Sequence, residues 1–277
     1  MDVQLFGQTF DITGTTDTGP RSENQDRFAW VAVSSGTMHG STTEGDIGPM
    51  EDRRPDMLVA VVCDGMGGMN SGGAASSTAI RMIIERASEA DFQSHASLVD
   101  AVVDAIADSD DMLMALYPGS GTTVSAVVAS HGRWSSVHLG DSRCYAVYPD
   151  SVWRTNDHSP VESMRIGGLI DEDEMNEHPM SNLVSYYVGG DFADRTEVQP
   201  IVEGWSRIVL CSDGAFGYMP PADFRSLART AEDAQGLVRA ALDAGSRDNT
   251  TALVLERIQQ IEKGARRALP SCNMDAE

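Results

Sequence analysis

Basic side chains are scarce in this chain of 277 residues. Lysine and arginine total 20 against 42 aspartates and glutamates, and the formal net charge is −22. Nonspecific binding to nucleic acid or to an anionic membrane needs clusters of lysine and arginine. The charge balance therefore argues against both kinds of partner, and it predicts that most of the acids lie on a solvated surface.

Long apolar runs are also missing. No run approaches the roughly 18 apolar residues that a bilayer-spanning helix needs. The first eight residues, Met-Asp-Val-Gln-Leu-Phe-Gly-Gln, lack the basic and apolar regions of a signal peptide. We therefore expect a soluble, cytoplasmic protein without a membrane span.

Cysteine is rare, and its spacing fits neither a disulfide framework nor a zinc site. The four cysteines, Cys63, Cys144, Cys211 and Cys272, form no C-x-x-C pair. Three of them lie inside apolar, strand-like runs, where a free cysteine behaves as a small buried hydrophobe. We expect free thiols in the core.

Strand-like and helix-like segments come in blocks. Strand patterns cover 28–33, 57–63, 123–130, 134–139, 144–148, 152–155, 198–202, 207–211 and 250–255. Helical patterns begin after Ser71 and cover 98–116, 222–229 and 231–244. A single strand alternating with a single helix would indicate parallel winding, whereas blocks of strands with helices in pairs predict an α+β fold of stacked antiparallel sheets covered by helices.

Three segments carry no clear core pattern. Residues 34–55, rich in Gly, Ser, Thr and acids, are expected to form a long exposed loop. Residues 156–194 are polar and irregular, with short helical patterns, and are expected to form a flap subdomain on the scaffold. One domain over 1–259 with a C-terminal tail over 260–277 is the expected organisation.

Aspartates stand at the ends of three apolar strand patterns. Asp64 follows the run 57–63, Asp213 follows 208–212, and Asp248 precedes 251–255. Carboxylates at the ends of central strands can converge on one point, where they repel one another unless a cation neutralises them. Oxygen-only ligands suit Mg²⁺ or Mn²⁺. The pattern predicts a site for hard metal ions.

Each motif is weak when it is taken alone. Asp-Gly is a common turn dipeptide, Asp248-Asn249 could be a capped turn, and an arginine such as Arg21 beside acids is usually a surface ion pair. Gly140-Asp141-Ser142-Arg143 could be a hairpin with an Asp-Arg contact. Asp64-Gly65-Met66-Gly67-Gly68 is stronger, because its glycines permit a ligand to approach the backbone closely.

Seven motifs occur together over about residues 10–257. They are Arg21-Ser-Glu-Asn-Gln25-Asp26, Asp64-Gly65-Met66-Gly67-Gly68, Ser120-Gly-Thr-Thr123, Gly140-Asp141-Ser142-Arg143, Asp157-His158-Ser159, Ser212-Asp213-Gly214 and Ser246-Arg-Asp248-Asn249-Thr250. In this order and at these intervals the chain closely resembles the metal-dependent serine/threonine protein phosphatases of the PPM, or type 2C, family, in their bacterial form.

The resemblance implies a fold, a site and a reaction. The fold is a four-layer α-β-β-α sandwich of two antiparallel sheets flanked by helix pairs. The substrates are phosphoserine and phosphothreonine in proteins, hydrolysed by direct attack of a metal-bridging hydroxide, in opposition to Ser/Thr kinases. A monomer with two Mn²⁺ or Mg²⁺ ions, and a third at a weaker site, is expected.

The residue roles follow from the same resemblance. Asp64 would bridge the two ions, with the Gly65 carbonyl on one of them, and Asp213 and Asp248 would bind the other. The third site would use Asp141 with Asp213. Asp26 would hold metal-bound water, and Arg21 would bind the substrate phosphate through its planar guanidinium.

Two positions depart from common family patterns. Met66 stands where many eukaryotic members have a histidine that protonates the leaving group, so a metal-bound water is expected to do this here. Gln25 stands where a glutamate is frequent, so one charge near the metals is missing. His158 is expected to have a hydrogen-bonding role in the structure rather than to act as a general acid.

Two alternatives to an ordinary phosphatase remain open. One is a catalytically weak or inactive regulatory pseudophosphatase, which retention of Arg21, Asp64, Asp213 and Asp248 disfavours. The other is a sigma-factor pathway phosphatase, whose members typically lack the Arg21-to-Asp26 motif and carry sensor domains.

Overall fold

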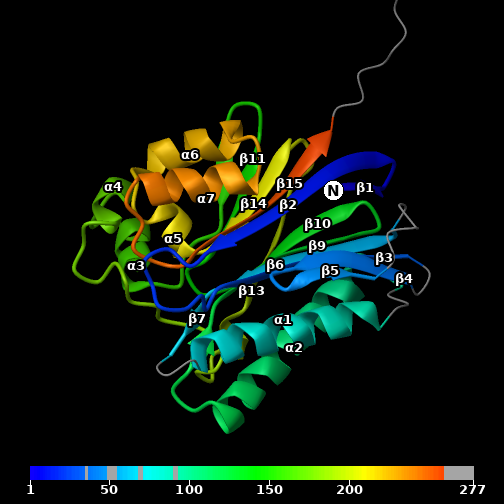
Figure 1. Cartoon of the computed structure of the whole chain (residues 1–277), viewed down its shortest axis with the longest axis horizontal. Helices are drawn as coiled ribbons and strands as arrows, with labels where there is room; N and C mark the ends of the chain where they lie inside the picture. Colours follow the sequence, from blue (N-terminus) through cyan, green and yellow to red (C-terminus); the bar gives the residue numbers. More distant parts are fainter. Residues whose placement is uncertain (35–36, 49–54, 68–70, 90–92, 259–277) are drawn as a thin grey trace, which may run out of the picture.

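Two antiparallel sheets stack face to face, and each is covered on its outer side by helices (Figure 1). The computed structural model describes residues 1–34, 37–48, 55–67, 71–89 and 93–258. Helices α1 (Ser71–Ser88) and α2 (His95–Leu116) pack on the seven-stranded sheet, while α6 (Pro221–Thr230) and α7 (Ala234–Asp243) pack on the six-stranded sheet. The α-β-β-α sandwich predicted from the sequence is confirmed.

The two sheets draw their strands from both halves of the chain. The six-stranded sheet has the order β1 (Asp2–Leu5), β2 (Gln8–Asp17), β15 (Thr250–Ile258), β14 (Arg207–Cys211), β11 (Arg143–Val147) and β12 (Val152–Arg154). The seven-stranded sheet has the order β13 (Glu197–Pro200), β10 (Arg133–Leu139), β9 (Val124–Ser130), β6 (Met57–Cys63), β3 (Arg27–Ser34), β4 (Thr37–Thr42) and β5 (Gly45–Ile47). The smaller elements are β7 (Gly65–Met66), paired with β8 (Gly121–Thr122), and the short helices α3 (Pro160–Ile166), α4 (Glu172–Met175), α5 (Asp213–Phe216) and η1 (Ala193–Arg195).

Strand β6 shows why the central strands are apolar without interruption. Successive side chains of a strand point to opposite faces, and in β6 both faces are buried. Val59 and Val61 pack toward α1 and α2, whereas Leu58, Ala60 and Val62 pack between the sheets. Burial on both faces explains why the run 57–63 has no polar alternation.

Three layers of core result from this arrangement. One lies between α1, α2 and the seven-stranded sheet, one between the two sheets, and one between the six-stranded sheet and α5 to α7. Strand β14 joins the second and third layers, because Leu210 faces the other sheet and Val209 faces the helices. The layers hold the strand ends, where the acidic motifs lie, in fixed relative positions.

The loop predicted for residues 34–55 is wrong in its described part. Residues 37–42 and 45–47 form β4 and β5, a hairpin at the edge of the seven-stranded sheet. Its threonines and glycines gave no apolar alternation, but pairing with β3 supplies the hydrogen bonds that define it. Residues 35–36 and 49–54 lie outside the described residues.

The sequence pattern also missed β1 and β2. Strand β2 is rich in threonine, and only Phe10 and Ile12 carry its apolar alternation. Its long pairing with β15, from Asp17–Thr250 to Thr9–Ile258, makes it a strand through contacts far apart in sequence. The helical pattern over 98–116 places Leu116 on the apolar stripe predicted to face the core, but in the structure this side chain is 62% exposed.

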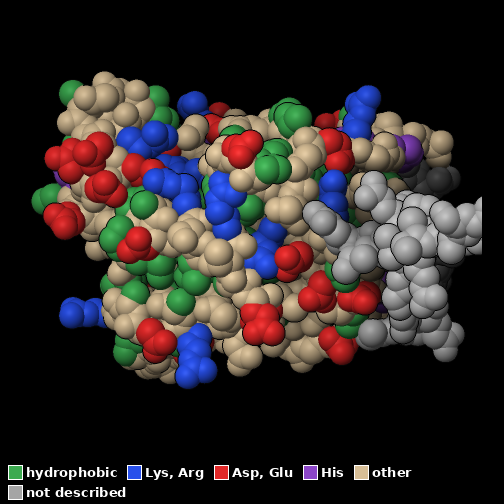
Figure 2. All heavy atoms as spheres, turned by 90° about the horizontal axis from the view of Figure 1, so that it is seen from above, with side chains coloured by type: hydrophobic (Ala, Val, Ile, Leu, Met, Phe, Trp, Pro, Cys, Tyr) green, Lys and Arg blue, Asp and Glu red, His purple; other side chains and the backbone are tan. Residues whose placement is uncertain are grey.

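The segment 156–194 contains α3, α4 and η1 and lies at the end of the sandwich that carries β7 and α5 (Figure 1). Figure 2 shows acidic side chains gathered at the end where α4 lies, and Asp171, Asp173, Glu174 and Glu177 are exposed there. Among the described residues, no helix combines the length and the apolar character needed to cross a membrane. The predicted tail, 260–277, lies outside the described residues.

Candidate active site

Strand register brings the predicted acidic residues to one end of the sandwich. In the seven-stranded sheet Arg27 pairs with Cys63, so the preceding Asp26 and the following Asp64 lie at the same edge. In the six-stranded sheet Cys211 pairs with both Arg143 and Ala252. This register places Asp213 beside the segments that carry Asp141 and Asp248.

The convergent residues line a cleft of about 610 Å³. Its walls include Arg21, Asp64, Gly65, Asp141, Asp213 and Asp248. Residues 182–184, from the segment predicted as a flap, close one side. A second polar cavity of about 430 Å³ adjoins it and shares Asp141, Asn182 and Asp213.

Hydroxyl and amide groups fix the backbone around Asp64. Thr123 accepts a hydrogen bond from the Asp64 amide at 2.9 Å, and the Thr122 hydroxyl donates to the Asp64 carbonyl at 2.8 Å. On the other side of the cleft, the side-chain oxygen of Asn249 accepts a hydrogen bond from the Gln25 amide at 2.8 Å and joins the loop of Arg21 to the start of β15. These contacts hold both sides of the cleft before any ligand arrives.

At two positions beside the acidic residues, another backbone segment passes so close that only glycine fits. A Cβ atom at Gly65 would collide with the Gly72 carbonyl at the start of α1 and with the Gln25 carbonyl. A Cβ atom at Gly214 would collide with the Asn249 carbonyl. Glycine after Asp64 and after Asp213 therefore has a packing reason.

The carboxyl groups raise one another's pKa. Burial and the carboxylates of Asp26, Asp213, Asp141 and Asp248 raise the pKa of Asp64 well above its usual value. Burial, followed by Asp248 and Asp26, raises the pKa of Asp213 to about 7. Burial raises the pKa of Asp26 to about 6, although a hydrogen bond from Ser212 opposes the rise. Negative charge in this cleft needs protons or cations to balance it.

Two buried oxygens give a direct test of whether cations would fit. Oδ1 of Asp26 and Oδ1 of Asp213 are buried and have no hydrogen-bond partner, whereas Oδ2 of Asp26 accepts from the Ser212 hydroxyl at 2.6 Å. Unpartnered carboxylate oxygens are costly unless something positive faces them. Oxygen donors alone suit hard divalent cations.

The ligand set is open rather than closed. Across the part of the chain that the structure describes, no group of three or more His, Cys, Asp or Glu side chains is arranged so that it could hold a metal ion without movement of a side chain. Asp248 instead contacts Arg21, whose Nη2 lies 2.7 Å from Oδ2. Because Mg²⁺ and Mn²⁺ keep several waters, an open set of carboxylates is compatible with either ion.

Arg21 lies at the mouth of the cleft. Its side chain is 56% exposed, and its Nε donates to the Arg247 carbonyl at 3.0 Å. A half-exposed ion pair of this kind contributes little stability. The guanidinium can therefore exchange Asp248 for an anionic ligand at low cost.

The thiols close to the cleft are unsuited to nucleophilic attack. Cys63, Cys144 and Cys211 are free and buried, as predicted. Burial, with Asp26 and Asp64, raises the pKa of Cys63 far above its usual value, and burial does the same for the pKa of Cys211. A thiol that stays protonated is a poor nucleophile. Cys272 lies outside the described residues.

Comparison with known proteins identifies the architecture. A family model described as protein phosphatase 2C matches residues 14–252. The chain is a member of the protein phosphatase 2C family.

Individual relatives agree with this membership. The serine/threonine phosphatase stp of Listeria innocua is 28% identical over an alignment of 235 residues, and the match covers 79% of this chain and 91% of the relative. The crystal structure of the serine/threonine phosphatase Stp1 from Staphylococcus aureus superimposes with a TM-score of 0.75 at 23% identity, covering 94% of this chain and 98% of that one. The catalytic domain of PstP, solved in complex with two manganese ions, gives a TM-score of 0.67 at 22% identity over 90% of this chain and 99% of that one.

In this phosphatase 2C chain, two residues to which the sequence analysis assigned no role also lie at the site. Ser212 holds Asp26, and Tyr218 lines both cavities. The Ser-Asp-Gly context of Ser212 was a usable signal, because the serine directly precedes a candidate ligand. No local signal marked Tyr218, since the turn after α5 alone brings it to the cleft.

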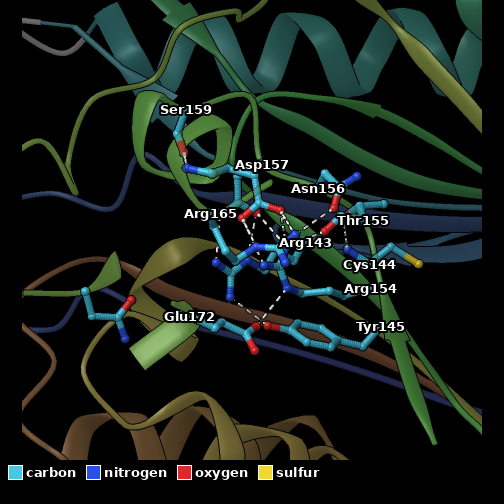
Figure 3. A network of polar contacts seen from close by, with 12 residues as sticks. Arg143, Cys144, Tyr145, Arg154, Thr155, Asn156, Asp157, Ser159, Arg165 and Glu172 are labelled. Carbon is cyan, nitrogen blue, oxygen red and sulfur yellow. Dashed lines mark hydrogen bonds and ion pairs between the residues drawn. The ribbon is translucent and has the colours of Figure 1, made fainter. Parts of the chain in front are cut away.

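Arg143 pairs with another acid than Asp141, the partner considered in the alternative interpretation of its motif. Arg143 pairs with Asp157 through two hydrogen bonds, Nε to Oδ1 at 2.7 Å and Nη2 to Oδ2 at 2.6 Å, and both side chains are buried (Figure 3). Its guanidinium also lies 3.8 Å from the centre of the Phe216 ring. Asp141 is thus left facing the cleft.

A network of ion pairs continues from Asp157 into the flap segment (Figure 3). Arg154, on β12, bonds Glu162 of α3 through Nη2 at 3.0 Å and Glu172 of α4 through Nε at 3.1 Å. His158 has the hydrogen-bonding role that was expected, because its Nδ1 accepts from the Gly140 amide at 3.2 Å. The network joins the start of the flap segment to the six-stranded sheet.

Stabilisation by metal should depend on pH. The pKa of an aspartate rises on folding from its ordinary value of 3.8 to about 6 for Asp26 and to about 7 for Asp213. From about pH 4 to about pH 7 the folded state therefore binds more protons than the unfolded state. The free energy of unfolding of the metal-free protein, kept in EDTA, falls as the pH rises through this range. Divalent cations bind only the ionised form of these carboxyl groups.

We expect calorimetry to show a larger rise in melting temperature on addition of Mn²⁺, compared with protein in EDTA, at about pH 8 than at about pH 5.5. An equal rise in melting temperature at both pH values would contradict this prediction. So would a difference between the two pH values in Asp213→Asn that is as large as in wild type.

Arg143→Met should destabilise the fold strongly. The substitution leaves the buried Asp157 carboxylate without its main partner, and breaking a buried pair in this way costs about 3–5 kcal/mol. Urea denaturation at equilibrium measures the loss of unfolding free energy. Arg81→Met, which breaks the exposed pair with Glu85, serves as the control and should cost less than about 1 kcal/mol. Similar losses in both variants would refute a structural role for the buried pair.

Proposed function

We propose that this chain is a divalent-metal-dependent phosphatase that hydrolyses phosphoserine and phosphothreonine in proteins. The observation that carries the proposal is the convergence of Asp64, Asp141, Asp213, Asp248 and Arg21 on one cleft. Membership of the protein phosphatase 2C family, and relatives named as serine/threonine phosphatases, support the same reaction.

The metal ions would be held by carboxylates from both sheets. Asp64 and the Gly65 carbonyl come from the seven-stranded side, and Asp213 and Asp248 from the six-stranded side, with Asp141 beside Asp213 for a third ion. When bound, divalent cations would supply positive charge beside the phosphoryl group and lower the pKa of water. The two manganese ions of the PstP structure support Mn²⁺ or Mg²⁺ as the cofactor.

The protein's own groups would position the substrate. Arg21 would release Asp248 and grip two phosphate oxygens, since a guanidinium matches phosphate in a bidentate manner. Asp26, which is buried and held by Ser212, would orient water close to Asp64. Positioning and charge neutralisation supply most of what phosphoryl transfer requires. With the thiols buried and protonated, no covalent intermediate on cysteine is needed.

Met66 lines the cleft but cannot donate a proton. In the described residues of the cleft wall there is no histidine. The leaving oxygen would therefore take its proton from water rather than from a side chain.

The substrates would be phosphoproteins made by Ser/Thr kinases. We propose the flap, 156–194, as the selectivity surface, because residues 182–184 form part of the cleft wall. The segment 34–55 was the other candidate for a selectivity surface, but its described residues 37–48 are absent from the described walls of both cavities. The monomeric state, the cytoplasmic location and the single domain over 1–259 stay predictions.

An inactive regulatory module gains no support, because the four residues whose loss would indicate it are all present around the cleft. The Arg21-to-Asp26 motif likewise remains an argument against the sigma-factor pathway.

Asp64→Asn and Asp213→Asn should each lower Mn²⁺-dependent phosphate release from a phosphothreonine peptide by about a hundredfold or more, because each removes a charged metal ligand. Asp223→Asn, an exposed position on α6, is the matched control and should keep wild-type turnover. Wild-type turnover in either cleft variant would sink the proposed site.

Arg21→Ala should raise the KM for the phosphopeptide by about tenfold or more, since a bidentate charged contact is lost. Affinity for Mn²⁺, measured by isothermal titration calorimetry, should stay within about twofold of wild type because Arg21 donates no metal ligand. Arg239→Ala, exposed on α7, controls for the loss of a surface charge. A large loss of Mn²⁺ binding in Arg21→Ala would contradict this division of roles.

A further inference from the structure

Asp110 makes an unusual set of contacts for a residue of a packed helix. It lies on α2, is only 3% exposed, and faces the same core as Ile106 and Leu113. Its carboxylate accepts hydrogen bonds from four backbone amides of one short segment: Gly189, Gly190 at 3.0 Å, Phe192 at 3.0 Å and Ala193 at 3.2 Å. No cation is among the partners that the structure gives it within the described residues.

The segment that Asp110 binds is shaped to hold an anion. Gly189 has φ of +101° and Asp191 has φ of +63°, so the chain reverses and turns successive N–H groups to one side. Concave arrangements of this kind bind anions. Here the anion is supplied by the protein's own α2, and two of the amides lie at the start of η1.

The same segment is joined to the strand pair beside Asp64. Val188 and Thr122 exchange two backbone hydrogen bonds of 2.9 Å. Thr122 pairs with Gly65 across β7 and β8, and its hydroxyl bonds the Asp64 carbonyl. Residues 189–193 are therefore connected through one strand pair to the floor of the cleft.

In the other direction the segment leads directly to the cleft wall. Only three residues, 185–187, separate Val188 from Val184, the last flap residue on the wall. Tyr186 and Tyr187 both pack edge-on against Phe192, within the segment that Asp110 holds. A shift at 189–193 would move these rings and the wall that they support.

We propose that Asp110 is a positioning residue for peptide substrates, which sets where the C-terminal end of the flap stands over the cleft. It acts through the backbone amides of 189–193 and touches no reacting atom. The Arg154 network holds the start of the flap on the six-stranded sheet, and Asp110 holds its end on the opposite helical layer. The kinetic part of this inference rests on the proposed phosphatase function.

The consequence is a split between substrates. A phosphopeptide reaches the flap wall, whereas p-nitrophenyl phosphate occupies only the space beside the metals. Asp110→Ala should therefore raise the KM for a phosphothreonine peptide by about tenfold, while kcat/KM for p-nitrophenyl phosphate changes by less than about threefold. Asp110→Asn keeps one carbonyl acceptor and should lie between wild type and Asp110→Ala.

Hydrogen exchange followed by mass spectrometry tests the contact itself. The amides of 189–193 should exchange about tenfold faster or more in Asp110→Ala than in wild type, with Asp110→Asn intermediate. Asp111→Asn, next along the same helix but exposed, is the matched control and should alter neither exchange nor kinetics.

The outcomes separate the contact between Asp110 and residues 189–193 from the proposed enzyme activity. Unchanged exchange at 189–193 in Asp110→Ala overturns the inference, and so does an equal loss for the peptide and for p-nitrophenyl phosphate. If wild-type protein released no phosphate, the proposed function would fail. The exchange measurement would still show whether Asp110 holds the backbone of residues 189–193. Should Asp110→Ala not fold, Asp110→Asn decides both measurements.

Discussion

Mutual repulsion among the carboxylates at one end of the sandwich is the constraint on which the rest of the molecule depends. Both sheets end at this point, and the packing between them forces Asp26, Asp64 and Asp213 to share a space from which bulk water is partly excluded. The core layers supply the stability that makes such crowding tolerable. Protons or divalent cations then neutralise the charge, so the fold couples its own stability to the occupancy of the cleft.

Charge pairing is organised differently in the cleft and in the flap. In the cleft acids face acids, and buried oxygens remain without partners. Beside it, Arg143 and Arg154 satisfy Asp157, Glu162 and Glu172 almost completely, and this rigid network ties α3 and α4 to the sheet. A cleft whose carboxylates lack partners, next to a network in which every charge is paired, suits a binding function. Only the cleft carboxylates gain hydrogen bonds or charge neutralisation from a ligand. The flap end held by Asp110 extends the same principle to a carboxylate that is neutralised by backbone amides.

Much of the fold could be predicted from local pattern where burial imposed it. The runs at 57–63 and 208–211 are apolar because both of their faces are covered, and both were found from the sequence. Strands β2, β4 and β5 were not found, since their threonines and glycines carry little hydrophobic signal and pairing with other strands decides their conformation. Asp110 escaped notice for a related reason, because nothing in a helical repeat reveals that four amides 79 or more residues away will converge on it.

The sequence by itself determined the chemistry available to this protein. The side chains of Asp64, Asp213, Asp248 and Arg21 are of the types that suit hard cations and phosphate. Glycines stand at the positions where backbone must approach backbone. Only the tertiary structure decided how those groups are arranged. Strand register placed the acids at one edge, Arg21 against Asp248, and Arg143 against Asp157 rather than Asp141. The physical reason is that residue type sets what a group can bind, whereas side-chain partners depend on long-range packing that no local pattern records.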